Sequence, residues 1–201
     1  SIEEQFLWPF DFLPRSGRVV AVPLYKGTYG RQAELPPGSN FPGDVARPSN
    51  TYRDATITWV QDLGRVIDYL GTRPDMDADR VGYYGFSHGG YLGPIILAVE
   101  DRLKAGVLNV GGLVPNWHFL PEADPINFVT RVTTPTLMIN GKYDIVLPYE
   151  TSQLPMYEML GTPAENKRHF VSESGHIVPK DDLIRETLAW FDRYLGPPGG
   201  G

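Results

Sequence analysis

The segment that most constrains the fold of this chain is residues 83–90, with the sequence Tyr-Tyr-Gly-Phe-Ser-His-Gly-Gly. The apolar and aromatic run at 80–86 is typical of a buried strand, and the apolar residues from 89 to 97 are typical of a packed helix. Ser87 is therefore expected on a tight turn, where Gly85 and Gly89 let strand and helix approach closely. Such a turn exposes the serine hydroxyl. It also places the backbone N–H of His88 at a helix N-terminus, where it favours a developing negative charge.

The composition bounds the class of protein. With 41% hydrophobic and 21% charged residues, the 201-residue chain is typical of a soluble globular protein, and we expect a single domain at 1–196 with a flexible Gly/Pro tail at 197–201. A net charge of -6 argues against a nucleic-acid partner. The absence of cysteine excludes disulfides, thiol catalysis and thiolate metal sites. No long apolar run or signal peptide is visible, so we expect no membrane partner and a cytoplasmic location.

Strand-like and helix-like segments alternate along the chain, which indicates a mostly parallel sheet covered by helices on both faces. The expected fold is a three-layer α/β/α sandwich with about five strands. The segment 26–50 is rich in glycine and proline and is predicted to be a functional surface loop, and the Pro-rich segment 114–134 is predicted to form a small lid. Strands are predicted at 18–25, 80–86, 105–111, 135–140 and 167–171, and helices at 1–13 (interrupted by Pro9), 51–70, 149–160 and 181–195.

A serine hydroxyl is a weak nucleophile at neutral pH, so it needs a base and a carboxylate that orients the base. Asp144 follows one predicted strand, and His176 follows the last predicted strand in a Ser-Gly-His loop. The carboxyl ends of parallel strands share one edge of a sheet, so Ser87, Asp144 and His176 are expected to converge there.

Other roles for these residues remain open at this point. Ser87 could only cap a helix, Asp144 could only form a turn, and His176 could be a solvated loop histidine. Asp124 and Asp181 are weaker rivals for the acid. The side chain of His88 is expected to pack beside the turn, and His118 and His169 are expected to be structural. No histidine and carboxylate spacing suits a metal ion, and no cofactor is expected.

Three motifs, at 77–90, 137–144 and 174–176, resemble the α/β-hydrolase superfamily, nearest the branch of dienelactone hydrolases, acetyl xylan esterases and prolyl oligopeptidase-like enzymes. The chain order Ser, Asp, His is the order of that superfamily. The resemblance covers nearly all of the chain. It implies that Ser87 is the nucleophile of a nucleophile elbow, with His176 as base and Asp144 as acid.

The sequence departs from this family at the oxyanion hole. The family's second oxyanion donor follows a strand that lies between the strand predicted at 18–25 and the strand that carries the elbow, and no strand precedes Ser1. The resemblance therefore implies a reduced fold without the first strands. Either 18–25 pairs directly with the elbow strand, or another chain fills the gap. Only the His88 N–H is assigned as a donor, with the hydroxyl of Tyr25 or Tyr29 as a substitute. The uncovered strand edge favours a homodimer.

The function that these features favour is a carboxylesterase-type serine hydrolase acting on a small-molecule ester with a short acyl chain or an exposed ester bond. Trp117 and Phe119 are either substrate contacts of the lid or ordinary packing. One alternative is a peptidase or amidase with the same triad. Another is a truncated, non-catalytic binding module, motivated by the missing oxyanion strand.

Overall fold

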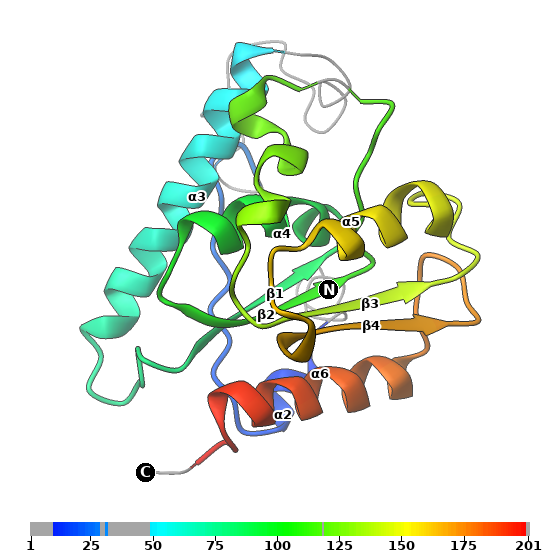
Figure 1. Cartoon of the computed structure of the whole chain (residues 1–201). Helices are drawn as coiled ribbons and strands as arrows, with labels where there is room; N and C mark the ends of the chain where they lie inside the picture. The colour runs from blue at the N-terminus through cyan, green and yellow to red at the C-terminus, as the bar shows by residue number, and fades with distance from the viewer. Residues whose placement is uncertain (1–9, 29–30, 32–48, 118, 200–201) are drawn as a thin grey trace.

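A parallel sheet of four strands forms the centre of the computed structural model, which describes residues 10–28, 31, 49–117 and 119–199. The strands lie in the order β1-β2-β3-β4, and each pairs in parallel with its neighbour. All four arrows therefore end at one edge of the sheet (Figure 1). The strands are β1 (Val81–Phe86), β2 (Leu103–Asn109), β3 (Thr136–Gly141) and β4 (Lys167–Ser172).

Helices cover both faces of this sheet. On one face lie α3, α4 and α5, and on the other lie α2 and α6 (Figure 1). The helices are α2 (Phe12–Arg15), α3 (Asn50–Gly71), α4 (His88–Val99), α5 (Leu154–Met159) and α6 (Lys180–Leu195). The short turns are η3 (Pro121–Ala123), η4 (Pro125–Asn127), η5 (Val129–Arg131), the π-helical turn η6 (Tyr149–Gln153) and η7 (Ala164–Asn166).

The two central strands explain why the sequence shows continuous apolar runs and no alternation. Leu108 and Met138 belong to the core beneath α3 and α4, whereas Val107 and Leu137 belong to the core beneath α6. All four side chains are fully buried. Because successive strand residues point to opposite faces, a strand that is covered on both sides must be apolar at every position.

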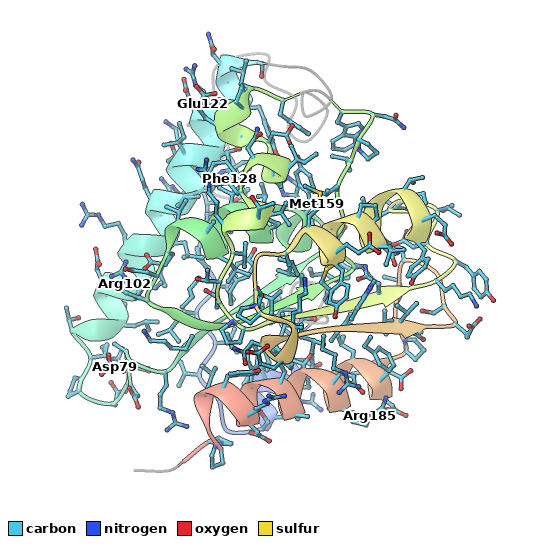
Figure 2. The ribbon with its side chains drawn as sticks, viewed as in Figure 1. Asp79, Arg102, Glu122, Phe128, Met159 and Arg185 are labelled. Carbon is cyan, nitrogen blue, oxygen red and sulfur yellow. The ribbon has the colours of Figure 1, made fainter. Side chains whose placement is uncertain are left out.

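The long helix α3 is fixed at both ends. At its start, the Ser49 hydroxyl accepts a hydrogen bond from the Tyr52 N–H at 3.1 Å, which satisfies one of the free donors of the first turn. Near its end, Arg102 donates to the Asp68 carboxylate at 2.6 Å and to the Gly64 carbonyl at 3.2 Å (Figure 2). Arg102 immediately precedes β2, so these bonds tie α3 to the start of that strand.

The segment predicted as a lid contains three short 3-10 turns. The turn η3, which carries Glu122, lies beside the N-terminal half of α3, and the turns η4 and η5, on either side of Phe128, lie over α4 (Figure 2). Asp124 caps the second of these turns, since its carboxylate accepts a hydrogen bond from the Ile126 N–H at 3.1 Å.

The fold class and the helix predicted at 51–70 are confirmed. The strand predicted at 18–25 is wrong, because this segment has no regular secondary structure. No backbone hydrogen bond joins its residues to β1 in the part of the chain that the structure describes. Its β-branched residues favour an extended chain, but a strand forms only beside a partner, and a cavity separates this segment from β1.

Other predictions need smaller corrections. The helix predicted at 149–160 is divided into η6 and α5, because Pro155 lacks the N–H that a continuous helix requires. Of the helix predicted at 1–13, only the start of α2 is described, because residues 1–9 lie outside the described residues, as does most of the loop at 26–50. No described helix combines the length and the apolar character that crossing a membrane requires.

Replacing Leu108 with alanine should lower the free energy of unfolding by about 2–5 kcal/mol, because the side chain is fully buried between β2 and α4. The matched control is Ile57→Ala on α3, whose side chain is 41% exposed and should cost less than about 0.5 kcal/mol. Equilibrium unfolding in urea measures the loss of unfolding free energy for both variants, provided that their m-values equal that of the parent chain. A Leu108→Ala loss no larger than that of the control would contradict the assigned core.

Candidate active site

Ser87 occupies the single residue between β1 and α4 and has a strained backbone. Its φ of 52° and ψ of -104° lie in a region that residues other than glycine rarely adopt. Two hydrogen bonds hold it there. The Ser87 N–H donates to the Asn109 carbonyl on β2 at 2.9 Å, and the Ser87 carbonyl accepts from the Tyr91 N–H at 2.8 Å. The serine is therefore fixed from the strand side and from the helix side, as strain of this kind requires.

Small residues at two positions allow this turn. A side chain at Gly85 would collide with the carbonyl of Gly89, so strand and helix meet directly there. A Cβ atom on Gly90 would lie 2.8 Å from the Gly111 Cα, in the chain that leaves β2. A Cβ atom on Gly89 would approach only the Tyr83 hydroxyl, at 3.4 Å. The close approach of strand and helix expected at Gly85 and Gly89 is present, and a second close approach joins Gly90 to the chain that leaves β2.

The structure brings Ser87, His176 and Asp144 together, although 89 residues separate the serine from the histidine. The Ser87 Oγ lies 2.9 Å from Nε2 of His176, and Nδ1 of the same ring lies 2.7 Å from Oδ2 of Asp144. Asp144 accepts only, so the imidazole donates from Nδ1 and leaves Nε2 free to accept the serine proton. This is the geometry of a nucleophile, a base and a carboxylate that orients the base.

Asp144 is buried, and both oxygens of its carboxylate accept hydrogen bonds. While Oδ2 faces His176, Oδ1 accepts from the backbone N–H groups of Val146 at 2.8 Å and Leu147 at 3.1 Å. These bonds fix the side-chain rotamer. They also supply hydrogen-bond donors to a buried carboxylate, whose burial would otherwise be costly.

The loops that carry Asp144 and His176 are joined backbone to backbone. The N–H of Lys142 donates to the Ser172 carbonyl, and the N–H of Tyr143 donates to the Ser174 carbonyl, both at 2.9 Å. No side chain fits at Gly141, because it would collide with the carbonyl of Gly175. These contacts continue the β3–β4 pairing and hold Asp144 and His176 in register.

His88 is not the base of this site. Its ring packs against Trp59 at 5.7 Å and Tyr91 at 5.9 Å, and burial lowers its pKa to about 4. Its backbone N–H is the first of α4, next to Ser87, where the positive end of the helix dipole lies. The backbone group therefore sits where an oxyanion donor is expected, and the side chain serves packing.

The other expected site residues have different outcomes. Tyr25 packs against Trp59, at 6.4 Å between ring centres, and lies on the wall of the cavity beside β1, whose lining does not include Ser87. Burial, with the nearby Asp62, raises the pKa of Tyr25, so its hydroxyl keeps its proton. Tyr29 lies outside the described residues. A second oxyanion donor is thus not assigned within the described part of the chain.

Of the two lid aromatics, only Trp117 faces solvent to a large extent. Phe119 packs on Tyr52 at 5.1 Å and on Tyr91 at 5.8 Å, while Trp117 contacts the edge of this cluster at 6.0 Å. A role for either ring in substrate binding stays a prediction, and His118, which separates them in the sequence, lies outside the described residues.

Comparison with known proteins gives the same architecture. No family model matches the sequence. The chain superposes on a protein of Klebsiella pneumoniae assigned as a dienelactone hydrolase, with a TM-score of 0.59 and 24% identity, over 69% of this chain and 62% of that one. It also superposes on acetyl xylan esterase 1 of Thermoanaerobacterium, with a TM-score of 0.55 and 20% identity, over 68% of this chain and 53% of that one.

The chain has the α/β-hydrolase fold. Curated proteins with similar sequences carry names of esterases and of a peptidase. Identity is 27% to cutinase est2 of Thermobifida alba (89% of this chain, 60% of that protein) and 30% to acetyl esterase Axe7A of Xylanibacter ruminicola (51% and 29%). It is 24% to the uncharacterized peptidase YuxL of Bacillus subtilis (61% and 23%). The chain thus spans less than two thirds of each of these relatives.

Within this α/β-hydrolase fold, sequence reasoning missed several residues that support the site. The Phe86 ring lies 6.2 Å from the His176 ring, and the Gln153 side chain donates to the carbonyls of Gly141 and Leu147 on either side of Asp144. The position of Phe86 immediately before Ser87 was a signal in the sequence that its ring would lie near the site. No signal marked Gln153, because its role depends on where η6 packs. No three His, Asp or Glu residues in the described ranges converge as metal ligands would.

Burial also lowers the pKa of His169 to about 4, so His88 and His169 should both stay neutral well below the usual histidine pKa of about 6.5. Between these pH values the unfolded chain binds more protons than the folded chain does. The free energy of unfolding should therefore fall as pH falls from 6.5 to 4, by up to about 3 kcal/mol per histidine. Imidazole proton shifts measured by NMR from pH 7 to 4.5 test this. Midpoints near 6.5 in the folded protein, as expected in urea, would contradict it.

Proposed function

We propose that this chain is a serine hydrolase that cleaves carboxylic esters through Ser87, His176 and Asp144. The observation that carries the proposal is the continuous hydrogen-bonded path from the Ser87 Oγ through both nitrogens of His176 to the buried Asp144 carboxylate. A capping serine would need neither a histidine nor a buried acid behind it. The strained backbone of Ser87 supports the same role, since strain of this kind is typical of functional sites.

The proposed reaction has two halves. In the first, Nε2 of His176 takes the Ser87 proton as Oγ bonds to the ester carbonyl carbon, and the His88 N–H stabilises the oxyanion. The C–O bond to the alcohol then breaks, and Nε2 returns the proton to the leaving oxygen. In the second half, water attacks the acyl-enzyme, losing its proton to Nε2 and releasing the acid and free Ser87. Asp144 holds the ring in the required tautomer and stabilises the imidazolium.

The surface next to Asp144 and His176 favours, as substrates, exposed esters that carry apolar groups. Ile145 and Val146, which follow the acid, are 91% and 60% exposed, and Ile177, which follows the base, is 51% exposed. Apolar side chains at such exposure, next in sequence to Asp144 and His176, would form an open apolar rim. The names of two relatives, a cutinase and an acetyl esterase, also favour an ester bond.

A peptidase with the same triad is the second candidate, favoured by the relative named a peptidase, YuxL. Amide cleavage needs strong protonation of the leaving group and a complete oxyanion hole. One oxyanion donor contributes about 3 to 4 kcal/mol to the transition state, and only the His88 N–H is assigned. Measuring kcat/KM for an ester and an anilide of the same acyl group distinguishes the two candidates. Cleavage of the ester alone favours the esterase, and cleavage of the anilide favours the peptidase.

Replacing Ser87 with alanine should abolish hydrolysis of p-nitrophenyl acetate and butyrate, with kcat falling by at least about 10⁴-fold, because the nucleophile is lost while the fold is retained. A fluorophosphonate probe should label the parent chain at Ser87 and leave this variant unlabelled. The matched control is Thr72→Ala at the exposed end of α3, which should keep full activity.

Equal turnover by Ser87→Ala and the parent chain would overturn the esterase proposal. A folded parent chain that neither hydrolyses the esters nor reacts with the probe would instead support the non-catalytic binding module.

Replacing Ile145 and Ile177 together with serine should lower kcat/KM for p-nitrophenyl octanoate about 5- to 30-fold and change it little for acetate. The reason is that only the longer acyl chain can bury apolar surface on this rim. Val99→Ser, at a side chain that is 55% exposed at the end of α4, controls for loss of a surface apolar group elsewhere. An equal loss for both esters would show that the rim does not select the acyl chain.

A further inference from the structure

The three residues of the proposed triad lie on opposite sides of the pairing between β2 and β3. Ser87 is bonded to the Asn109 carbonyl at the end of β2, whereas Asp144 and His176 follow β3 and β4. The pairing of β2 with β3 stops at Asn109 and Ile139, while the pairing of β3 with β4 continues to the end of both strands. The distance between Ser87 and His176 therefore depends on what joins the two sides beyond this point.

The chain that leaves β2 is strained where this pairing stops. Val110 has a φ of 47°, which is uncommon for any residue except glycine and most costly for a β-branched side chain. Its N–H donates to the Ile139 carbonyl at 2.7 Å. The resulting turn presses against the first turn of α4, since a Cβ atom on Gly90 would lie 2.9 Å from the Asn109 carbonyl oxygen and 2.8 Å from the Gly111 Cα. Strain of this kind persists only where the surroundings hold it.

The side chain of Asn140 holds this turn from β3. It is fully buried, and its Nδ2 donates to the Gly111 carbonyl at 2.8 Å. Its Oδ1 accepts from Nε2 of His169 on β4 at 3.0 Å. Burial lowers the pKa of His169 to about 4, so at pH 7 the neutral ring carries one N–H, which this bond places on Nε2. Tyr149 and Tyr157 flank the ring, at 5.9 and 5.1 Å between ring centres. The amide of Asn140 is thus oriented, with its donor toward β2 and its acceptor toward β4.

We propose that Asn140 is a positioning residue that sets the distance between Ser87 and His176. His169 orients it. Its hydrogen bond to Gly111 joins β3 to the chain leaving β2 where the strand pairing has stopped, and so holds the strained turn beside the residue to which Ser87 is bonded. Packing alone would favour an apolar side chain here, because burying an amide costs free energy that only hydrogen bonds offset. This role rests on the proposed function.

Loss of the Asn140 amide should displace Ser87 and leave Asp144 and His176 in place. The loops of the latter two are joined by β3–β4 pairing and by the backbone bonds that follow it, none of which uses the Asn140 side chain. A displacement of about 1 Å can slow a reaction about 10²-fold. The loss should fall on kcat and not on KM, because the surface that binds the ester is unchanged.

The kinetic test compares Asn140→Leu, which keeps the branching of the side chain and removes its hydrogen bonds, with Thr162→Val as the matched control. Thr162 is also buried and also bonds to two carbonyls, but those of Val132 and Thr134 precede β3, at the end of the strand opposite the triad. For p-nitrophenyl acetate, Asn140→Leu should lower kcat about 10²-fold at nearly constant KM, and Thr162→Val should change neither. The rate at which a fluorophosphonate labels Ser87 should fall in parallel with kcat.

Hydrogen exchange followed by NMR tests the same role without reference to activity. The amides of Gly106 and Val110 both donate from β2 and the chain that leaves it to the β3 side, to Pro135 at 2.8 Å and to Ile139 at 2.7 Å. In Asn140→Leu, the Val110 amide should exchange at least about tenfold faster than in the parent chain. The Gly106 amide, at the other end of the pairing, should keep its parent rate. Equal acceleration of both amides would indicate a general loss of stability and would contradict the proposed role.

His169→Phe supplies a second variant, which decides the matter if Asn140→Leu does not fold. The phenylalanine ring can remain between Tyr149 and Tyr157 but cannot donate to Asn140, so kcat should fall about 2- to 10-fold and the Val110 amide should exchange faster. His169→Gln, whose side-chain amide can donate in place of the ring, should recover most of the loss.

Parent-like kcat in Asn140→Leu and in His169→Phe would overturn the positioning role, as would equal losses of kcat in Asn140→Leu and Thr162→Val. Faster Val110 exchange with unchanged kcat would overturn it too, since the turn would then not position Ser87. An Nδ1–H tautomer of His169 in the parent chain, read from its ring nitrogen shifts, would remove the stated orientation of Asn140. A folded parent chain that neither hydrolyses esters nor reacts with the probe would instead defeat the proposed function, and the positioning role with it.

Discussion

The close approach of α4 to the ends of β1 and β2 is the constraint on which the site depends. It requires the small residues Gly85 and Gly90, and it leaves a single residue, Ser87, to reverse the chain from strand to helix. A backbone hydrogen bond to Asn109 holds that residue in a strained conformation. The strain is stable because strand and helix are each fixed by the two cores, and it exposes the hydroxyl and the first N–H of α4 at one point.

Asp144 and His176 reach that point through backbone geometry. Their loops continue the pairing of β3 with β4, so the distance from Asp144 to His176 follows from strand register. Side chains then fix orientation: two backbone donors hold the carboxylate of Asp144, and Gln153 braces the turn on which it lies.

Much of this arrangement was predictable from the sequence, and the failures share a cause. The helix α3 was predictable from its own apolar spacing, and β2 and β3 from runs that are apolar at every position. The segment 18–25 has the composition of a strand as well, yet no described strand lies beside it, since strand formation needs a partner that composition does not reveal. The helix predicted at 149–160 is present as two consecutive segments, η6 and α5, and Pro155 lies in the first turn of α5.

The sequence by itself predicted that Ser87, Asp144 and His176 meet, because a parallel sheet brings the ends of its strands to one edge. Only the tertiary structure decided how the two histidines are placed: Nε2 of His176 lies 2.9 Å from the Ser87 Oγ, whereas His88, the neighbour of Ser87 in the sequence, is packed against Trp59 and held neutral by burial. It also decided that a cavity separates β1 from the segment 18–25. These outcomes depend on packing between residues far apart in the chain, which local pattern does not encode.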